Sequence, residues 1–295
     1  MTHFTRGAAL ALCTLLAACQ SAAPTVPATS AKLSQPVRLN FAGYVNGEPF
    51  VCGRSYDKVG SAASRITPTD FRFYVSDVAL LDAAGHATPL TLDQDGAWQY
   101  RNIALIDLED GAGPCRNGTA ATHPQLTGHV PPGDYRGVRF TVGLPMALNH
   151  ADVTLAPPPL NLTAMFWNWQ AGYKFFKFDA SVAQPASAGN TRSAGFPVHV
   201  GSTQCSAESP TSPATHCRNG NRVEISLSPF DPARHTIEVD IGRLLAHTDL
   251  SRNTPGTAAG CMSAPDDPEC NPLLREYGLP FAGQPALPQQ LFRVR

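Results

Sequence analysis

The sequence predicts an all-β protein, a single β-sandwich-like domain with long disulfide-stapled loops that follows a signal peptide and a flexible tether. Three observations support this class. Apolar residues alternate with a period of two in several short segments, 27 prolines and 24 glycines supply turns between them, and eight cysteines occur in a chain that begins like an exported protein. Short alternating strands joined by many turns close naturally into two packed sheets.

The first 18 residues are predicted to be a lipoprotein signal peptide. One basic residue, Arg6, precedes an apolar Ala/Leu-rich run over residues 8–18, and small residues stand directly before Cys19. The run is too short to span a bilayer, and this ending is typical of a bacterial lipoprotein processing site. Cys19 is therefore the expected lipidation site. Gln20 favours the outer membrane, facing the periplasm or the cell surface, and an ordinary secretory signal is the alternative.

The remaining chain is expected to form a tether and one domain. Residues 19–35 are rich in Ala, Ser, Thr and Pro and nearly uncharged, which predicts a flexible lipidated tether. Residues 36–295 suit one large β domain. The formal net charge is −1 and no Lys/Arg run occurs, so a nucleic-acid partner is excluded.

Six segments carry the alternation that predicts strands with one face toward a core. They are Val37-Leu39-Phe41, Phe71-Phe73-Val75, Val138-Phe140-Val142, Phe175 with Phe176 and Phe178, Val223-Ile225-Leu227, and Ile237-Val239-Ile241. Short helices are expected over residues 242–247 and around residues 273–276.

Six cysteines remain after the signal peptide and the anchor, and an even number in an oxidising compartment predicts three disulfides. They are Cys52, Cys115, Cys205, Cys217, Cys261 and Cys270. Sequence alone leaves the connectivity open, but short loops favour Cys205 with Cys217 and Cys261 with Cys270, which leaves Cys52 for Cys115. The stretch over residues 202–221 is then expected to be a stapled surface loop. A thiolate metal site is the alternative, but the chain has no Cys-x-x-Cys pair.

The chain offers no familiar catalytic motif. It contains no nucleophile elbow, phosphate-binding loop, zinc-protease motif, Cys-x-x-Cys-His haem site, or nicotinamide or flavin fingerprint. We therefore expect a protein that is not itself an enzyme.

An aromatic segment, with two separate histidines, is the most distinctive feature. In a continuous strand, Met165, Trp167, Trp169 and Tyr173 would share one face. Such a face is consistent with core packing or with a platform that binds an organic ligand or a protein.

Several separated blocks of the chain resemble one family. They are residues 70–80, residues 105–111, residues 135–145, Leu148-Asn149-His150, residues 165–179, and His199-Val-Gly-Ser-Thr-Gln-Cys205. In this order they are similar to the MbnP-like lipoproteins, the four-Cys proteins of the "metallo-mystery pair". The four cysteines of that label correspond here to Cys205, Cys217, Cys261 and Cys270.

The resemblance implies a copper-binding protein that acts in copper acquisition or handling. It also implies a partner, an MbnH-like di-haem cytochrome peroxidase that oxidises a tryptophan of this chain to kynurenine. The chain would thus be the substrate of an enzyme. An indole offers no basic lone pair, whereas kynurenine has an aromatic amine and a ketone, so the modification would create a metal ligand. A nitrogen-rich site suits copper.

The family blocks point to His150 and His199 as copper ligands and to Trp169 or Trp167 as the oxidised residue. Trp98 is set aside because its Gly-Ala-Trp-Gln setting is typical of an exposed turn. The other histidines are expected to be surface or structural. They are His86, His123, His129, His216, His235 and His247.

Calcium is a second cofactor considered, through the acidic cluster Asp107, Glu109 and Asp110. The alternative for this region is a buried ion pair of Arg72 with Asp77, Asp107 or Asp179. The alternative function for the whole protein is a lipid-anchored β-sandwich that binds an organic ligand or a protein through Trp167, Trp169 and Tyr173.

Overall fold

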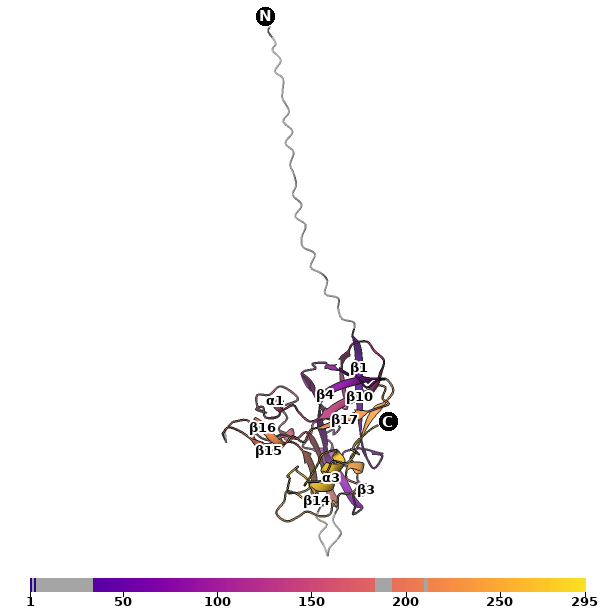
Figure 1. Ribbon diagram of the computed structural model, residues 1–295, viewed down its shortest axis with the longest axis vertical. Coiled ribbons are helices and arrows are strands. Elements are labelled where there is room, and N and C mark those ends of the chain that lie inside the picture. The colour runs from indigo at the N-terminus through magenta and orange to yellow at the C-terminus, as the bar shows by residue number, and fades with distance from the viewer. Residues whose placement is uncertain (2, 4–33, 184–192, 210–211) are drawn as a thin grey trace. The chain divides into compact units, whose positions relative to one another are not determined.

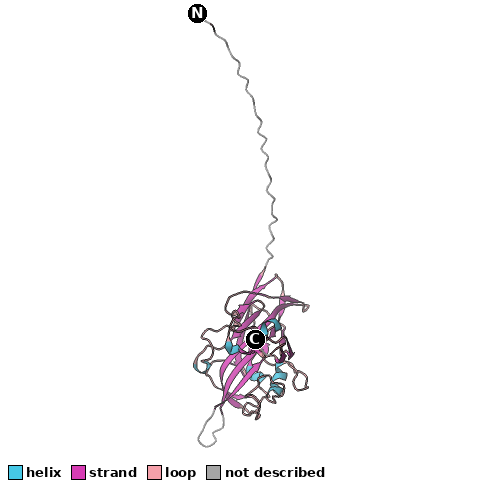
Figure 2. Cartoon of the chain, turned by 90° about the vertical axis from the view of Figure 1, so that its left-hand side faces the viewer, coloured by secondary structure: helices cyan, strands magenta, loops and turns pink. Residues whose placement is uncertain are grey.

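A computed structural model describes residues 1, 3, 34–183, 193–209 and 212–295 (Figures 1 and 2). Nearly all of the predicted signal peptide and tether, including the lipidation site Cys19, lie outside these residues. The chain divides into two units, Met1–Lys32 and Leu33–Arg295, and the second contains every strand described below. No helix in the described part of the chain is long and apolar enough to cross a membrane.

Two sheets form the body of the folded unit. The first has the order β19 (Phe292–Val294), β18 (Thr236–Asp240), β1 (Gln35–Val45), β9 (Gln125–Val130) and β6 (Thr91–Leu92), with β2 (Glu48–Pro49) paired to β1. The second has the order β14 (Ser193–Val200), β13 (Phe176–Ala183), β4 (Ser64–Asp82), β10 (Tyr135–Val142) and β17 (Val223–Leu227). It also contains β3 (Tyr56–Val59), β5 (Ala87–Pro89) and β8 (Ile103–Asp107) on β4, and β7 (Gln99–Tyr100) on β8.

The two sheets pack face to face, which confirms the predicted all-β class. Phe41 of β1 contacts Phe73 of β4 at 5.7 Å and Phe140 of β10 at 5.8 Å between ring centroids, both nearly edge to face. Phe292 of β19, which lies in the same sheet as Phe41, contacts the same two rings. Edge-to-face contacts of this kind favour a fixed arrangement of the core.

The remaining elements are short. They are the hairpin strands β11 (Phe166–Asn168) with β12 (Gly172–Tyr173) and β15 (Thr203–Ser206) with β16 (His216–Asn219), the helices α1 (Met146–Asn149), α2 (Ile241–Leu244) and α3 (Cys270–Tyr277), and the 3-10 turns η1 (Gly113–Cys115) and η2 (Thr163–Met165). The helices α2 and α3 confirm the two predicted helical segments. Figure 1 shows α1 beside β15 and β16.

The long strand β4 is buried on both faces over most of its second half. Phe71, Phe73 and Val75 face the sandwich core, while Arg72 and Tyr74 face the opposite side because side chains alternate along a strand. A second apolar cluster, which includes Tyr74 and Tyr173, covers this outer face. The chain between β10 and β13 therefore forms a layer over the larger sheet, and the polar residues discussed below lie beneath and beside it.

All three predicted disulfides are present: Cys52–Cys115, Cys205–Cys217 and Cys261–Cys270. The prediction of a loop over residues 202–221 is wrong in part, because Cys205 and Cys217 are directly opposite each other in the β15–β16 hairpin. Cys261–Cys270 ties the start of α3 to the segment beside β14.

Candidate metal centre

The aromatic segment forms a hairpin, which corrects the predicted continuous strand. Phe166 pairs with Tyr173 and Asn168 with Gly172, so the chain reverses between β11 and β12. The Asn168 side chain accepts hydrogen bonds from the backbone of the turn, and Gly172 has a φ of +77°, a conformation that L side chains rarely adopt. Asn168 and Gly172 are the residues from which this turn could have been predicted in the sequence. The four aromatic and sulfur-containing side chains consequently do not share one face.

The reversal gives the two neighbouring tryptophans different environments. Trp169 lies at the hairpin tip and is 46% exposed. Trp167 is half-buried, and its ring lies so close to Gly201 that a Cβ there would come within 2.5 Å of the indole. Its ring centroid is 6.4 Å from that of His199, at a tilt of 49°. Trp167 is thus the tryptophan of this hairpin whose ring lies next to the ring of a predicted histidine.

His199 is held by one nitrogen and has a second nitrogen without a partner. Its Nε2 lies 2.7 Å from Oδ1 of Asp179, across the β13–β14 pair, so Nε2 carries the proton and donates it. Its Nδ1 is buried and has no hydrogen-bond partner among the described residues. The backbone N–H of His199 donates to the carbonyl of Cys261 at 2.8 Å, and its carbonyl accepts from Ser263. The ring is therefore fixed, with a lone pair on Nδ1.

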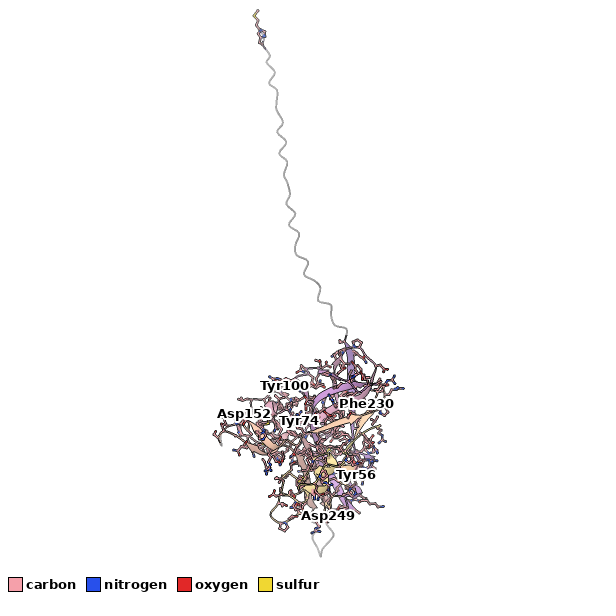
Figure 3. All side chains as sticks on the ribbon, in the orientation of Figure 1. Tyr56, Tyr74, Tyr100, Asp152, Phe230 and Asp249 are labelled. Carbon is pink, nitrogen blue, oxygen red and sulfur yellow. A yellow bond between two sulfur atoms is a disulfide. The ribbon has the colours of Figure 1, made fainter. Side chains whose placement is uncertain are left out.

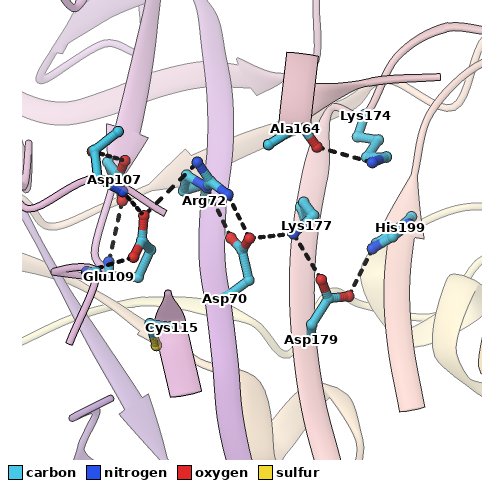
Figure 4. Close-up of polar contacts among 12 residues, drawn as sticks. Asp70, Arg72, Asp107, Glu109, Cys115, Ala164, Lys174, Lys177, Asp179 and His199 are labelled. Atoms are coloured by element: carbon cyan, nitrogen blue, oxygen red, sulfur yellow. Dashed lines mark hydrogen bonds and ion pairs between the residues drawn. The ribbon is translucent and has the colours of Figure 1, made fainter. Parts of the chain in front are cut away.

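Asp179 belongs to a row of alternating charges on the outer face of the larger sheet, which we call the charge chain (Figure 4). It runs through Glu109, Arg72, Asp70, Lys177, Asp179 and His199. Its members come from neighbouring strands, because Arg72 pairs with Lys177 in the β4–β13 register and Lys177 with His199 in the β13–β14 register. The sequence contained a sign of this arrangement, because Asp70 and Arg72, like Lys177 and Asp179, are charged residues two positions apart in otherwise apolar strands and so lie on the same face.

Each anion of the charge chain lies next to a cation. Arg72 binds both oxygens of Asp70 and approaches Glu109 at 3.8 Å. The prediction that Arg72 forms an ion pair with Asp77, Asp107 or Asp179 is therefore wrong. Lys177 contacts Asp70 and lies 2.7 Å from Asp179. Burial without such pairing would be strongly unfavourable for each of these groups.

The charge chain determines the protonation of its last members. Burial raises the pKa of Asp179, but the hydrogen bonds and charges of His199 and Lys177 outweigh it and hold that pKa well below its usual range. Burial also lowers the pKa of His199, which Asp179 opposes in part. His199 is therefore expected to be neutral near pH 7, with the proton on Nε2.

The ring of His150 is also held in one orientation, but both of its nitrogens contact other polar atoms. It caps α1, and its Nδ1 donates to the carbonyl of Trp169 at 3.0 Å. Its Nε2 lies 3.0 Å from the side-chain nitrogen of Asn149 and 3.4 Å from Sγ of Cys217. Cys217 is bonded to Cys205, so these sulfur atoms are not free thiolates.

The two predicted histidine ligands contact the same hairpin at different points. His150 touches its tip through the carbonyl of Trp169, and His199 faces the ring of Trp167. No hydrogen bond, ion pair or ring contact joins His150 to His199 within the described ranges. A pocket of about 370 Å³ lies beside Trp167 and is also lined by Ser202 and Met262.

The third tryptophan is not in a freely exposed turn, which corrects the prediction for Trp98. Its indole is half-buried and stacks on His123 at 5.2 Å between ring centroids and 3° between planes. Nδ1 of His123 donates to the carbonyl of Leu105 at 2.8 Å, and Asp95 anchors the turn through backbone N–H groups including that of Trp98. The structure thus contains a second tryptophan–histidine contact.

The acidic cluster proposed for calcium is used within the fold. The two oxygens of Glu109 accept the backbone N–H groups of Gly111 and Thr119, and Asp110 accepts that of Ala112. Burial and the neighbouring Glu109 raise the pKa of Asp107 to about 8. These contacts support turn formation and give no support to calcium binding by Asp107, Glu109 and Asp110.

The fold and this centre define a class: an all-β sandwich with a tryptophan and an oriented histidine on the outer face of its larger sheet. The chain belongs to the MbnP family, whose family model matches residues 34–263. MbnP from Methylosinus trichosporium, a solved structure, is 33% identical with a TM-score of 0.76, and the match covers 89% of this chain and 98% of that chain. No match was found among curated proteins. The family is linked to copper-related systems and consists of accessory proteins rather than known catalysts.

Proposed function

We propose that this protein binds copper at a centre built from His199, His150 and an oxidised Trp167. In this proposal a partner di-haem peroxidase of the MbnH type converts the tryptophan to kynurenine, and the mature protein serves copper acquisition or handling. The chain is then a substrate of its partner and a carrier of the metal.

The observation that carries the proposal is the buried Nδ1 of His199 beside Trp167, which has no hydrogen-bond partner in the described part of the chain. A buried polar atom without a partner is unfavourable, and a metal ion is one group that satisfies it. The contact of Nε2 with Asp179 is the arrangement found behind metal-bound histidines, where a carboxylate fixes the tautomer and makes the ligand more basic.

The surroundings favour Trp167 over Trp169 as the oxidised residue. An indole has an N–H donor and no lone pair for a metal. Oxidative cleavage of its C2–C3 bond with two equivalents of hydrogen peroxide, the oxidant of the proposed peroxidase partner, adds two oxygen atoms and releases two water molecules. Hydrolysis of the formyl group then releases formate and leaves an aromatic amine and a ketone. At Trp167 these new groups would form next to His199, whereas the ring of Trp169 is half-exposed at the hairpin tip.

The available donors fit copper. Imidazole and amine nitrogens suit copper, and hard cations such as Mg²⁺ prefer oxygen. Nε2 of His150 would become available if the side chain of Asn149, which contacts it at 3.0 Å, moved aside. Both cysteines near His150 are in a disulfide, so the proposed centre contains no thiolate.

The location and the partner complete the proposal. The Ala-Ala-Cys sequence ending at Cys19 supports a lipid anchor at the outer membrane, facing the periplasm or the cell surface. The partner must reach Trp167 directly or through neighbouring residues, and the half-exposed Trp169 offers an aromatic surface next to it.

The test is peptide mass spectrometry across Met165–Lys174 on protein produced with and without the peroxidase partner, with metal analysis of both samples. We expect kynurenine at position 167 and bound copper in the partner-treated sample alone. Unmodified Trp167 and no copper in both samples would refute the proposal, and kynurenine at position 169 would refute its choice of residue.

The pocket beside Trp167 supports a second candidate, the binding of an organic ligand through an aromatic surface. The two functions separate in a His199→Ala variant. Copper binding should be lost there, while binding of an aromatic or heterocyclic ligand in the pocket should persist.

A further inference from the structure

Buried oxygen atoms without partners gather far from the charge chain in the sequence. Eight buried side-chain polar atoms lack a hydrogen-bond partner in the described part of the chain, and six of them belong to residues between Thr248 and Tyr277. These six are Thr248 Oγ1, Asp267 Oδ2, Glu269 Oε2, Asn271 Oδ1, Glu276 Oε2 and Tyr277 OH. All are oxygens. Figure 3 marks the two regions: Asp249, next to Thr248, lies well apart from Asp152, which is two residues after His150.

Two of these oxygens belong to carboxyl groups that are already fixed by their other oxygen. Oδ1 of Asp267 accepts the backbone N–H of Glu269 at 3.0 Å. Oε1 of Glu269 accepts the N–H and the hydroxyl of Thr254 at 2.9 and 2.7 Å. The carboxyl groups lie within hydrogen-bonding reach of each other, and Cys261–Cys270 closes this segment covalently. The second oxygens of the two groups, Asp267 Oδ2 and Glu269 Oε2, are therefore held in place.

No cationic side chain that the structure describes forms an ion pair with either carboxyl group. Lysine, arginine and histidine nitrogens within the described ranges all lie more than 4 Å from both carboxyl groups, in contrast to every acid of the charge chain. Burial raises the pKa of Asp267, and the adjacent Glu269 raises it further. Asp267 is only 1% exposed. Two adjacent carboxyl groups in this position must therefore either share a proton or bind a cation.

Glu269 of this pair lines a pocket that offers further oxygens. This pocket, of about 290 Å³, is lined by Thr248, Asp249, Thr254 and Glu269, and Arg252 also borders it. Thr248 is 1% exposed and its hydroxyl has no partner. The donor set around the pair is thus made of oxygen atoms from carboxylates and hydroxyls, which hard divalent cations prefer over sulfur and nitrogen ligands.

We propose that a calcium ion binds between Asp267 and Glu269, with the Thr248 hydroxyl as a neutral oxygen of the same site. Calcium fits better than Mg²⁺ because it accepts irregular sets of oxygen ligands, including bidentate carboxylates, whereas Mg²⁺ requires near-octahedral geometry. The ion would join the segment over residues 248–254 to the start of α3.

The site would support the copper centre from a distance. Cys261, which closes the calcium segment through its disulfide, accepts the backbone N–H of His199 at 2.8 Å, and Val198 forms a bridge with it. Calcium would therefore rigidify the segment that positions the backbone of His199. The calcium site itself needs neither copper nor an oxidised tryptophan.

The test uses protein made without the peroxidase partner, stripped with EDTA and returned to buffer free of metals. We expect isothermal titration calorimetry to give one calcium ion per chain, and thermal unfolding to shift upward with calcium and much less with magnesium. Asp267→Asn and Glu269→Gln should each weaken calcium binding by at least about tenfold, while Asp266→Asn, at an exposed neighbouring acid, should not.

Absence of any calcium effect on the wild-type unfolding temperature at millimolar calcium would overturn the inference. So would equal calcium binding by the Asp267→Asn variant, or a stabilisation by Asp267→Asn without calcium dependence, which would indicate a shared proton. If the charge variants do not fold, terbium luminescence is measured for the wild type and for Thr248→Val. Calcium should displace the bound terbium from the wild type, and Thr248→Val should bind it more weakly. Lack of displaceable terbium would refute the site whatever the outcome for copper.

Discussion

Two tryptophan rings lie against a histidine ring in the described part of the chain, and the two histidines differ in whether a ring nitrogen is left without a hydrogen-bond partner. Trp98 stacks flat on His123, with 3° between the ring planes, whereas Trp167 meets His199 at 49°. His123 donates from Nδ1 to a backbone carbonyl, and its Nε2 lies 4.0 Å from Asp95 in a half-buried setting. His199 donates from Nε2 to the half-buried carboxylate of Asp179, and its buried Nδ1 has no hydrogen-bond partner among the described residues.

The comparison shows that proximity of an indole and an imidazole does not by itself make a metal centre. A histidine binds a metal through a deprotonated nitrogen, and the group on the opposite nitrogen decides which one that is. At His123 the flat stack covers one face of the ring, and the stacked Trp98 packs against the second apolar cluster. At His199 the charge chain holds the ring in an orientation that keeps a lone pair next to Trp167.

The largest difference is expected between the two tryptophans. Trp167→Phe should abolish both kynurenine formation and copper binding after treatment with the peroxidase partner, because phenylalanine cannot yield the amine ligand. Trp98→Phe should retain both. Mass spectrometry and metal analysis of the two variants test this, and copper loss in Trp98→Phe with retention in Trp167→Phe would reverse the assignment.

The second-largest effect is expected when the two histidines, His199 and His123, are replaced. In His199→Gln the copper affinity should fall by more than about 100-fold, because losing a direct ligand exceeds the ~10–100-fold cost of losing a partner of a ligand. His123→Gln should bind copper within about threefold of the wild type, since removing a distant partner changes no ligand. Competition with a chromophoric copper chelator measures both. Equal affinities in the two variants would show that His199 is not a ligand.

The carboxylates behind the histidines provide a finer test. Asp179→Asn should weaken copper binding by about 10–100-fold because an amide no longer holds the Nε2 proton with a full charge. Asp95→Asn, the matched change near His123, should leave copper affinity unaltered. The same chelator competition applies, with thermal unfolding to confirm that both variants are folded. An unchanged copper affinity in Asp179→Asn would show that the charge chain does not contribute to copper binding.

The smallest effect concerns the protons themselves. Before copper binds, long-range ¹H–¹⁵N NMR should find the proton on Nε2 in His199 and on Nδ1 in His123. Burial lowers the pKa of both, so both should titrate below the usual value of about 6.5. A lowered histidine pKa favours the neutral folded form, so the stability it contributes is present above the unfolded pKa and is lost as pH falls. The same tautomer at both histidines would contradict the comparison.

Much of the fold could be predicted from local patterns. Alternating apolar residues predicted the main strands, because a strand with one buried face requires that period wherever it lies in the structure. Short sequence separations favoured the disulfides Cys205–Cys217 and Cys261–Cys270, and the third followed by elimination. The motif blocks predicted the MbnP family, which the family model and a solved structure confirm.

The arrangement of the site depended on contacts between distant residues. The pairing of His199 with Asp179 follows from the β13–β14 register, and the link through Lys177 to Asp70 from the β4–β13 register. Neither register can be read from one strand alone. The hairpin reversal at Asn168 likewise separated Trp167 from Trp169, although period-two alternation had placed them together.

The primary structure therefore determined which residues are available for chemistry: three tryptophans, nine histidines and the acids around them. Tertiary packing selected among them, because the free energy of a lone pair, a buried charge or an unpaired oxygen depends on which atoms surround it. Those atoms come from other strands. Trp98 with His123 and Trp167 with His199 are similar pairs in composition, and their neighbours in space make one a packing contact and the other a candidate metal centre.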